Sequence, residues 1–261
     1  MDAGLKNQCV LVTGASGGIG QAIARALAAE GASLALHYRT NADSVQTLRR
    51  ELSVPCLAVQ ADLRDERQVD AMFTAILGRF PQIHSVIANA GIWNAGAVPL
   101  HEMALAQWHA TLKSDLTSVF LTCRAFLRHL AEVPRESASI VLVGSTAALF
   151  GEADHADYAA AKAGMAYGLT RSVKNEIVGL APRGRVNCVC PGWTETPMAA
   201  GHADDPAVIQ RVTSTMALRK IARPQDVAAA VVFLVSDALA GHISGAIIPV
   251  AGGMEGRLLH P

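Results

Sequence analysis

The sequence lacks a charge excess of either sign and lacks any long apolar segment. Its 261 residues include 22 Lys and Arg and 22 Asp and Glu, so the formal net charge at pH 7 is zero. Without a basic excess, we expect no nucleic-acid partner and no binding to an anionic membrane surface. No run approaches the roughly 18 apolar residues of a membrane span, and residues 1–8 are too short and polar for a signal peptide. We therefore expect a cytoplasmic protein with no membrane partner.

Cysteine is scarce and scattered. The five cysteines stand at positions 9, 56, 123, 188 and 190, mostly in apolar segments, as is typical of buried thiols in a reducing compartment. Cys188 and Cys190 would share one side of a strand, but no second Cys/His pair completes a metal site. We therefore predict no bound metal.

Linkers, internal repeats and low-complexity segments are also missing. The length allows one large α/β domain or two small ones, and the lack of a composition break favours one domain over residues 1–261. Hydrophobic residues make up 51% of the chain and charged residues 17%, which predicts a large buried core.

Short apolar runs alternate with longer segments of helical spacing. The predicted strands are 9–12, 33–38, 56–60, 85–88, 139–144, 185–190 and 246–250. The predicted helices are 21–29, 41–53, 65–80, 104–130, 154–180 and 223–236, whereas 193–222 looks irregular. This alternation predicts an α/β fold, a Rossmann-type doubly wound parallel sheet with helices on both faces.

A glycine-rich turn joins the first strand to the first helix. Residues 13–20 read TGASGGIG, and such a turn lets the backbone and a helix N-terminus approach an anion. The alternative is a tight turn with no ligand, but the flanking strand and helix favour binding. Gly14, Asn89, Ser145 and Pro191 each follow a strand, so we expect them to converge on one edge of the sheet.

Tyr158 and Lys162 are four residues apart in a helical segment and therefore share one face. A free tyrosine has a pKa of roughly 10, and a nearby cation lowers it toward a range useful for proton transfer. The pair alone also occurs by chance. Ser145, 13 positions before Tyr158, adds a hydroxyl for a substrate oxygen. Together the three groups suit proton transfer coupled to hydride transfer at a carbonyl.

Over residues 13–253 the chain resembles the short-chain dehydrogenase/reductase family. The resemblance rests on TGASGGIG, Asp62-Leu63, Asn89-Ala90-Gly91, Ser145, YAAAK, RVNCVCPGW and the C-terminal PQDVAAAVVFLVSD and ISGAIIPVAGG. It implies that Tyr158 is the acid/base, that Lys162 holds the nicotinamide ribose and that Ser145 polarises the substrate carbonyl. It implies further cofactor contacts at Gly14, Ser16, Gly18, Ile19, Gly20, Asp62, Leu63, Asn89, Pro191, Gly192 and Thr196.

Two positions depart from the family pattern. Asp115 stands where the family normally has an Asn that holds a water in the proton relay. Its carboxylate could bind that water or pair directly with Lys162, so the relay survives in altered form or turnover is low. Ala251 stands where the family commonly has an Asp before two glycines, so a contact or capping role of that Asp is lost.

The nicotinamide cofactor is expected to be NADP(H), with NAD(H) as the open alternative. Tyr38 ends the second strand, where members that prefer NAD carry an Asp, and Arg39 follows it. Arg39 could pair with a 2′-phosphate or be a solvated loop cation. Gly17 supplies no basic residue within the glycine turn, so the choice stays open.

The substrate pocket is expected to include Trp93, Phe150 and Trp193, next to Ser145 and Tyr158, whereas Leu149 and Met198 favour the core. A mobile lid is expected within 193–222, around 201–206. His155 could touch substrate, but a solvated position at a helix start is favoured. The substrate would be a small carbonyl or alcohol: a 3-oxoacyl thioester, sugar, steroid or specialised metabolite.

We expect a carbonyl/alcohol oxidoreductase. The alternative is a nucleotide-binding regulatory or scaffold protein with weak catalysis because of Asp115. The resemblance also implies a homotetramer or homodimer, with helices 104–130 and 154–180 at the dimer face.

Overall fold

Seven parallel strands form one sheet in the order β3-β2-β1-β4-β5-β6-β7. The computed structural model describes residues 2–94, 96–196 and 206–258. The strands are β1 (Cys9–Val12), β2 (Ser33–Tyr38), β3 (Cys56–Gln60), β4 (Ser85–Ala88), β5 (Ser139–Val143), β6 (Arg185–Pro191) and β7 (Ile247–Val250). This confirms the predicted parallel α/β fold.

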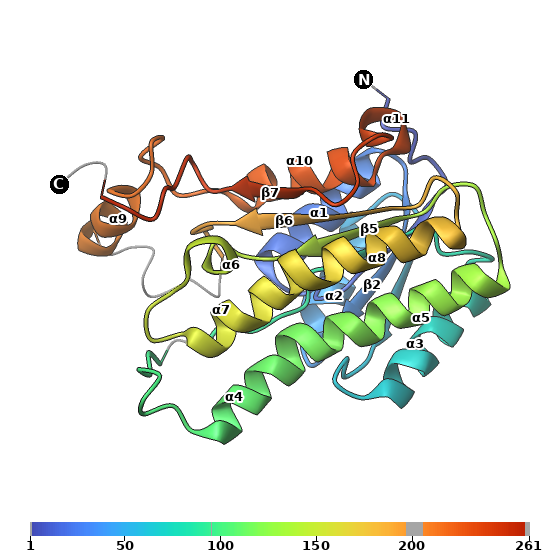
Figure 1. Cartoon of the computed structure of the whole chain (residues 1–261). Coiled ribbons are helices and arrows are strands. Elements are labelled where there is room, and N and C mark those ends of the chain that lie inside the picture. Colours follow the sequence, from blue (N-terminus) through green and yellow to red (C-terminus); the bar gives the residue numbers. More distant parts are fainter. Residues whose placement is uncertain (1, 95, 197–205, 259–261) are drawn as a thin grey trace.

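Helices cover both faces of the sheet (Figure 1). One face carries α3 (Glu66–Arg79), α4 (Leu105–Leu112), α5 (Ser118–Glu132), α7 (Ala156–Ala163) and α8 (Thr170–Glu176). The other carries α1 (Gly18–Ala29), α2 (Ala42–Glu51) and α10 (Pro224–Val235). The described chain also has three short α-helices and one 3₁₀-helix: α6 (Ala147–Phe150), α9 (Pro206–Thr213), α11 (Asp237–Ala240) and Ile177–Gly179.

Each face of the sheet has its own apolar core, and β1 contributes to both. Cys9 and Leu11 pack into the core beneath α3, α5 and α8, whereas Val10 and Val12 pack into the core beneath α1 and α10. Successive strand residues point to opposite faces, so a strand covered on both sides needs a continuous apolar run. This is why β1 reads CVLV without a polar residue.

Several predicted boundaries were wrong. Helix α1 begins at Gly18, three residues before the predicted start, because the glycine turn leads directly into the helix. The predicted helices 104–130 and 154–180 are interrupted by π-helical turns at Lys113–Thr117 and Gly164–Leu169. The segment 193–222, expected to be irregular, contains α9. Short helices such as α6, α9 and α11 have too few turns to show a periodic pattern.

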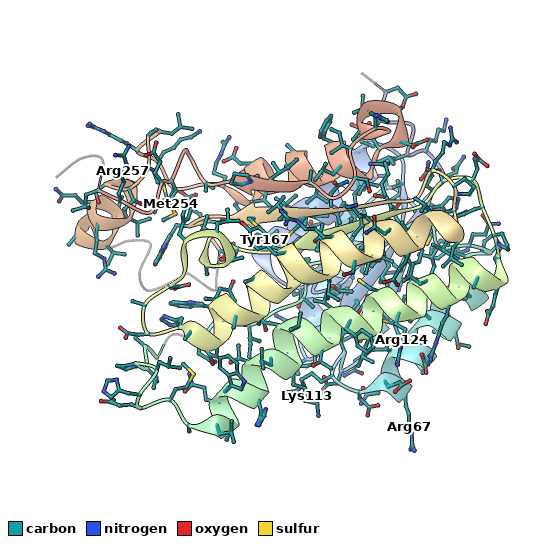
Figure 2. All side chains as sticks on the ribbon, in the orientation of Figure 1. Arg67, Lys113, Arg124, Tyr167, Met254 and Arg257 are labelled. Carbon is teal, nitrogen blue, oxygen red and sulfur yellow. The ribbon has the colours of Figure 1, made fainter. Side chains whose placement is uncertain are left out.

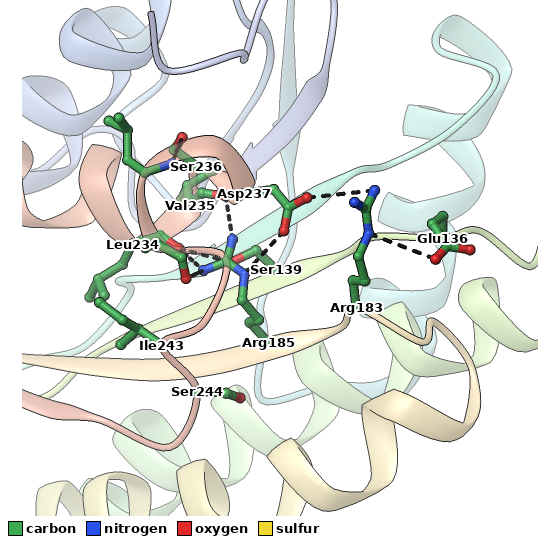
Figure 3. A network of polar contacts seen from close by, with 12 residues as sticks. Glu136, Ser139, Arg183, Arg185, Leu234, Val235, Ser236, Asp237, Ile243 and Ser244 are labelled. Atoms are coloured by element: carbon green, nitrogen blue, oxygen red, sulfur yellow. Dashed lines mark hydrogen bonds and ion pairs between the residues drawn. The ribbon is translucent and has the colours of Figure 1, made fainter. Parts of the chain in front are cut away.

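A buried arginine closes the edge of the molecule opposite the strand ends. Arg185, at the start of β6, donates from Nη1 to the carbonyl oxygens of Leu234 (2.7 Å) and Ala240 (3.1 Å). Its Nη2 donates to the carbonyl of Val235 at 2.9 Å, and Asp237 lies 3.7 Å from its Nε (Figure 3). The cation therefore binds carbonyls at the C-terminal ends of α10 and α11, where carbonyl groups lack intrahelical partners.

Charged side chains lie along the outer surface of the helices, as Arg67 on α3 and Lys113 before α5 illustrate (Figure 2). Within the ranges that the structure describes, no helix is long and apolar enough to cross a membrane. Cys188 and Cys190 are buried free thiols whose sulfur atoms lie 3.8 Å apart, on the shared strand side that alternation predicts.

Candidate active site

A cleft of about 620 Å³ opens at the carboxyl ends of the strands. Gly14, Asn89, Ser145 and Pro191 all line it, so the predicted convergence of these strand ends is found. The cleft lining also contains every predicted cofactor-contacting position, namely Gly14, Ser16, Gly18, Ile19, Gly20, Arg39, Asp62, Leu63, Asn89, Tyr158, Lys162, Pro191, Gly192 and Thr196.

The glycine turn is packed too tightly for side chains at two positions. Gly14 has φ +66°, and a Cβ there would lie 2.9 Å from Ala90 Cα. A Cβ on Gly20 would lie 2.2 Å from the carbonyl oxygen of Gly14. Among the described residues no side chain caps α1, and its first turn holds no acidic residue. Its first N–H groups therefore remain available to an anion in the cleft.

Two polar side chains fix the end of β1 against the end of β4. Thr13 Oγ1 accepts from the backbone N–H groups of Asn89 (2.9 Å) and Ala90 (3.0 Å). Asn89 Nδ2 donates to the carbonyl of Thr13 at 2.9 Å and to that of Gly14 at 3.3 Å. The Asn89 side chain thus holds the start of the glycine turn in place.

His37 in β2 supports the same turn, and sequence reasoning missed it. Its Nδ1 accepts from the N–H of Gly14 at 3.1 Å, and its Nε2 lies 3.0 Å from the carbonyl oxygen of Ala61. Burial lowers the pKa of His37 from 6.5 to about 4, although Ala61 and Asp62 raise it in part. The sequence did contain a signal for this role, namely a histidine within the apolar run SLALHY. A polar side chain buried in a strand needs hydrogen-bond partners, and a neighbouring turn can supply them.

Arg39, Asp62 and Arg64 lie together at the end of the cleft formed by β2 and β3. The Arg64 Nη2 is 2.6 Å from Asp62 Oδ2, and this hydrogen bond, with the nearby Arg39 charge, lowers the pKa of Asp62 to about 2. Sequence reasoning missed Arg64. Because Asp62 pairs with Arg64, Arg39 is an exposed cation with no salt bridge to any residue that the structure describes.

Ser145, Tyr158 and Lys162 meet deeper in the cleft. The Lys162 Nζ lies 5.5 Å from the centre of the Tyr158 ring and donates to the carbonyl of Val143 at 3.3 Å. Burial raises the pKa of Tyr158 above its usual value of 10, whereas Lys162 and a hydrogen bond with Ser145 lower it. The predicted effect of Lys162 is therefore present, but it does not outweigh burial in the protein alone.

Asp115 pairs directly with Lys162. It is fully buried in the π-helical turn Lys113–Thr117, where its Oδ1 accepts from the N–H of Ile92 at 2.9 Å. Its Oδ2 lies 3.6 Å from Lys162 Nζ and has no hydrogen-bond partner among the described residues. Burial raises the pKa of Asp115, while Lys162 lowers it in part. Of the two interactions expected for Asp115, the structure shows the ion pair.

Gly91 makes this ion pair possible. A Cβ at position 91 would lie 3.0 Å from Asp115 Oδ2 and 3.1 Å from Lys162 Nζ. Burial lowers the pKa of Lys162, but Tyr158 and Asp115 raise it, and the net direction is above the usual value of 10.5. The lysine is therefore held as a cation beneath the phenol.

The family model described as Enoyl-(Acyl carrier protein) reductase matches residues 14–255. This chain belongs to the short-chain dehydrogenase/reductase family. It is an oxidoreductase, since its relatives are named dehydrogenases or reductases that act on alcohol or carbonyl groups.

Two curated relatives are similar to this short-chain dehydrogenase/reductase over almost its whole length. The cis-4-hydroxycyclohexanecarboxylate dehydrogenase of Sinomonas cyclohexanicum is 39% identical over 259 residues, covering 97% of this chain and 98% of the relative. The 3-oxoacyl-[acyl-carrier-protein] reductase of Synechocystis sp. is 34% identical, covering 96% and 98%.

Solved structures of the family share the fold. A 7α-hydroxysteroid dehydrogenase complexed with NADH and 7-oxo glycochenodeoxycholic acid has a TM-score of 0.88 at 26% identity, covering 98% of each chain. Levodione reductase has a TM-score of 0.85 at 30% identity, covering 95% of this chain and 98% of its own.

The substrate end of this family member differs from expectation at two residues. Trp93 and Trp193 line the cleft, but Phe150 does not: it is 45% exposed and lies beside Gly256. His155 is buried rather than solvated, because its ring stacks on Trp93 with centroids 4.9 Å apart. Leu149 packs against the core, as expected. Met198 and positions 201–205 of the expected lid lie outside the described residues.

Proposed function

We propose that this short-chain dehydrogenase/reductase interconverts a small carbonyl compound and its secondary alcohol with NADP(H). The observation that carries the proposal is the single cleft that joins the glycine turn to Ser145, Tyr158 and Lys162. A phosphate-binding helix start and a proton-transfer group in one cleft suit hydride transfer at a carbonyl.

The residues at the strand ends fit a nicotinamide dinucleotide. The uncapped start of α1 offers N–H groups to a pyrophosphate, and Asn89 holds the turn that presents them. The cofactor would supply the hydride. Tyr38 puts no carboxylate at the end of β2, and the exposed Arg39 next to it suits a 2′-phosphate, which supports NADP(H) over NAD(H).

Three side chains would carry the proton chemistry. Ser145 Oγ accepts from the N–H of Ala147 at 3.1 Å, and its hydroxyl, which hydrogen-bonds with Tyr158 in the protein alone, would donate to a substrate oxygen placed between the two. Tyr158 would donate its proton to that oxygen during reduction and accept one during oxidation. Lys162, held by Asp115, would bind the ribose hydroxyls and stabilise the phenolate.

Replacing Tyr158 by Phe tests the chemistry. The variant removes the phenolic O–H and keeps the ring, so kcat should fall by about 10²–10⁴, while the Kd for NADPH stays within about twofold. A panel of ketones and alcohols followed by NADPH absorbance provides the assay. Near-normal turnover by this variant would overturn the mechanism.

Replacing Arg39 by Ala tests the cofactor. We expect the wild type to favour NADPH over NADH in kcat/KM, and the variant to lose about tenfold or more of that preference because a bidentate phosphate pair is lost. A strong NADH preference that the variant leaves unchanged would refute NADP(H).

The names of two relatives support a cyclic substrate. They specify a hydroxycyclohexane ring and a hydroxysteroid, and the two tryptophans Trp93 and Trp193 give this cleft large apolar walls. We therefore propose a carbocyclic ketone or secondary alcohol as the substrate class, in a cytoplasmic enzyme of one domain.

We also propose a homodimer or homotetramer. Phe120 on α5 is 42% exposed, and Tyr167, in the π-helical turn before α8, is 43% exposed. The guanidinium of Arg124 lies over the Phe120 ring, and that of Arg171 lies over the Tyr167 ring. These exposed aromatic side chains suit burial against a second copy. Sedimentation that finds only monomer would refute it.

A further inference from the structure

A cluster of three side chains borders the substrate end of the cleft and takes no part in the proposed proton transfer. Trp93 follows β4, whereas Glu152 and His155 lie in the segment between α6 and α7. Trp93 Nε1 donates to Glu152 Oε1 at 3.1 Å, and the Trp93 ring stacks on His155 at an interplanar angle of 19°. The three side chains therefore form one packed unit.

Backbone contacts hold this unit rigidly. The two ring nitrogens of His155 lie 3.1 Å from the carbonyl oxygen of Ala153 and 3.0 Å from that of Asn94. Val98 donates its N–H to the carbonyl of Asp154 at 2.9 Å, which joins the same two loops a second time. A side chain on such a fixed wall keeps its position when a substrate binds.

Glu152 faces the reacting groups. It lines the cleft with Ser145 and Tyr158, 32% of its side chain is exposed, and its charge contributes to raising the pKa of Tyr158. Trp93 donates to Oε1, whereas Oε2 accepts no hydrogen bond from the described residues. Burial raises the pKa of Glu152, whereas His155 and the Trp93 hydrogen bond lower it.

No described cation balances this carboxylate from within the cleft. The cationic residues that line the described cleft are Arg39, Arg64 and Lys162. Arg64 pairs with Asp62, and Lys162 pairs with Asp115. Arg39 lies at the opposite end, beside β2. The His155 Nδ1 lies 3.7 Å from Glu152 Oε1, but His155 does not line the cleft.

We propose that Glu152 is a specificity-determining residue: its carboxylate accepts a hydrogen bond from a hydroxyl or amino group of the substrate and disfavours substrates that carry a carboxylate there. The inference rests on the proposed function, because a carbonyl held at Ser145 and Tyr158 brings the rest of the substrate toward Glu152. Like charges forced together in a partly desolvated site are strongly unfavourable, whereas a donor group gains a charge-assisted hydrogen bond.

The test compares cyclohexanones that differ only at carbon 4, with a hydroxyl, an amino group, a carboxylate or its methyl ester. We expect the wild type to reduce the hydroxyl or amino ketone at least about tenfold better in kcat/KM than the carboxylate. Comparison of the hydroxyl with the amino compound shows which donor is preferred. A wild type that prefers the carboxylate would overturn the proposal.

Glu152→Gln removes the charge and keeps an oxygen for Trp93. In this variant the ratio of kcat/KM for the carboxylate to kcat/KM for the methyl ester should rise about tenfold, because the effect of the lost charge on Tyr158 is common to both ketones. Glu102→Gln, an exposed position outside the cleft, is the matched control and should leave this ratio unchanged. An unchanged carboxylate-to-ester ratio in Glu152→Gln refutes the role of Glu152.

A binding measurement separates this inference from the proposed function. Calorimetry without any nicotinamide cofactor, so that neither ketone can react, should show the wild type binding the 4-hydroxyl cyclohexanone more tightly than the 4-carboxylate cyclohexanone, and Glu152→Gln losing that preference. Glu152→Asp, which keeps the charge, should retain it. If no ketone turns over with either nicotinamide cofactor, the proposed function fails, while these affinities still decide whether Glu152 discriminates. Equal affinities in wild type and Glu152→Gln would refute the discrimination.

Discussion

Replacing Asp115 by Asn removes one buried negative charge without changing the size of the side chain. The new amide oxygen can still accept from the N–H of Ile92, so the local backbone keeps its hydrogen bond. The Lys162 Nζ, 3.6 Å away, loses its anionic partner and keeps the carbonyl of Val143. The main consequence is electrostatic: the negative charge of Asp115 raises the pKa of Tyr158, and the variant lacks that charge.

The distances set the size of the effect. The Lys162 Nζ lies 3.6 Å from Asp115 Oδ2 and 5.5 Å from the centre of the Tyr158 ring, so the carboxylate is within about 9 Å of the ring. At that separation two unit charges interact by roughly 1–2 kcal/mol for an effective dielectric constant of about 20–40. One pKa unit corresponds to about 1.4 kcal/mol, so the pKa of Tyr158 should fall by about one unit.

The assay is the pH dependence of kcat/KM, because its limbs report the acid and base of the free enzyme. In the proposed alcohol oxidation the Tyr158 phenolate would be the base, so the acidic limb should move to lower pH by about one unit in Asp115→Asn. In ketone reduction the basic limb should move the same way. Lys162 opposes the burial effect on Asp115, so we expect the carboxylate to be ionised in the alkaline range where Tyr158 titrates.

The matched control is Asp70→Asn, the same chemical change on an exposed carboxylate of α3. It should leave both limbs of the pH profile in place, because solvent screens a charge on an exposed side chain. Limbs that stay in place in Asp115→Asn, with thermal stability preserved, would show that the carboxylate does not act on Tyr158. An upward movement would contradict the sign of the argument.

Three further predictions concern stability and the cofactor turn. Stability should fall as pH decreases from about 6.5 to about 4, because the folded protein resists protonation of the buried His37, whose pKa is lowered from 6.5 to about 4. The loss from His37 is about 3 kcal/mol, measurable by urea unfolding at several pH values, and His37→Asn should flatten the dependence. Arg185→Met should cost roughly 3–5 kcal/mol, because it removes three hydrogen bonds to the carbonyls of Leu234, Val235 and Ala240 and leaves Asp237 without the Arg185 cation. An effect under about 1 kcal/mol in the same urea assay would contradict this. Gly20→Ala should lower the free energy of unfolding by about 1–3 kcal/mol and weaken NADPH binding in calorimetry, since its Cβ would lie 2.2 Å from the Gly14 carbonyl oxygen. The control is Gly78→Ala, which should be neutral or stabilising because no atom lies within 4 Å of its Cβ.

The sheet could be predicted from the sequence because each strand buried on both faces needs an unbroken apolar run, as in β1. The meeting of Gly14, Asn89, Ser145 and Pro191 followed from parallel topology alone. The π-helical turn that holds Asp115 did not, because one extra residue in a turn scarcely alters the apolar spacing on which the helix prediction depends.

The substrate end was harder to predict, because no spacing rule places a loop side chain. Trp93 and Phe150 are both aromatic residues in short segments after strands, yet Trp93 lines the cleft and Phe150 lies outside it. Glu152 carried no motif at all. Its position depends on the hydrogen bond from Trp93 and on the loop contacts of His155, which join segments about 60 residues apart.

Asp115 and Glu152 act on Tyr158 in the same direction, although they reach it from different elements. Each carboxylate raises the pKa of the phenol, and burial raises it further, while Lys162 and Ser145 oppose them. The balance in the protein alone favours the protonated phenol, which is the form that donates a proton to a carbonyl oxygen. The departure of Asp115 from the family pattern therefore leaves Tyr158 protonated, as the proposed reduction requires. In the proposed mechanism Lys162 would stabilise the phenolate against two carboxylates, which requires that Lys162 keep its charge. The ion pair with Asp115 itself maintains that charge.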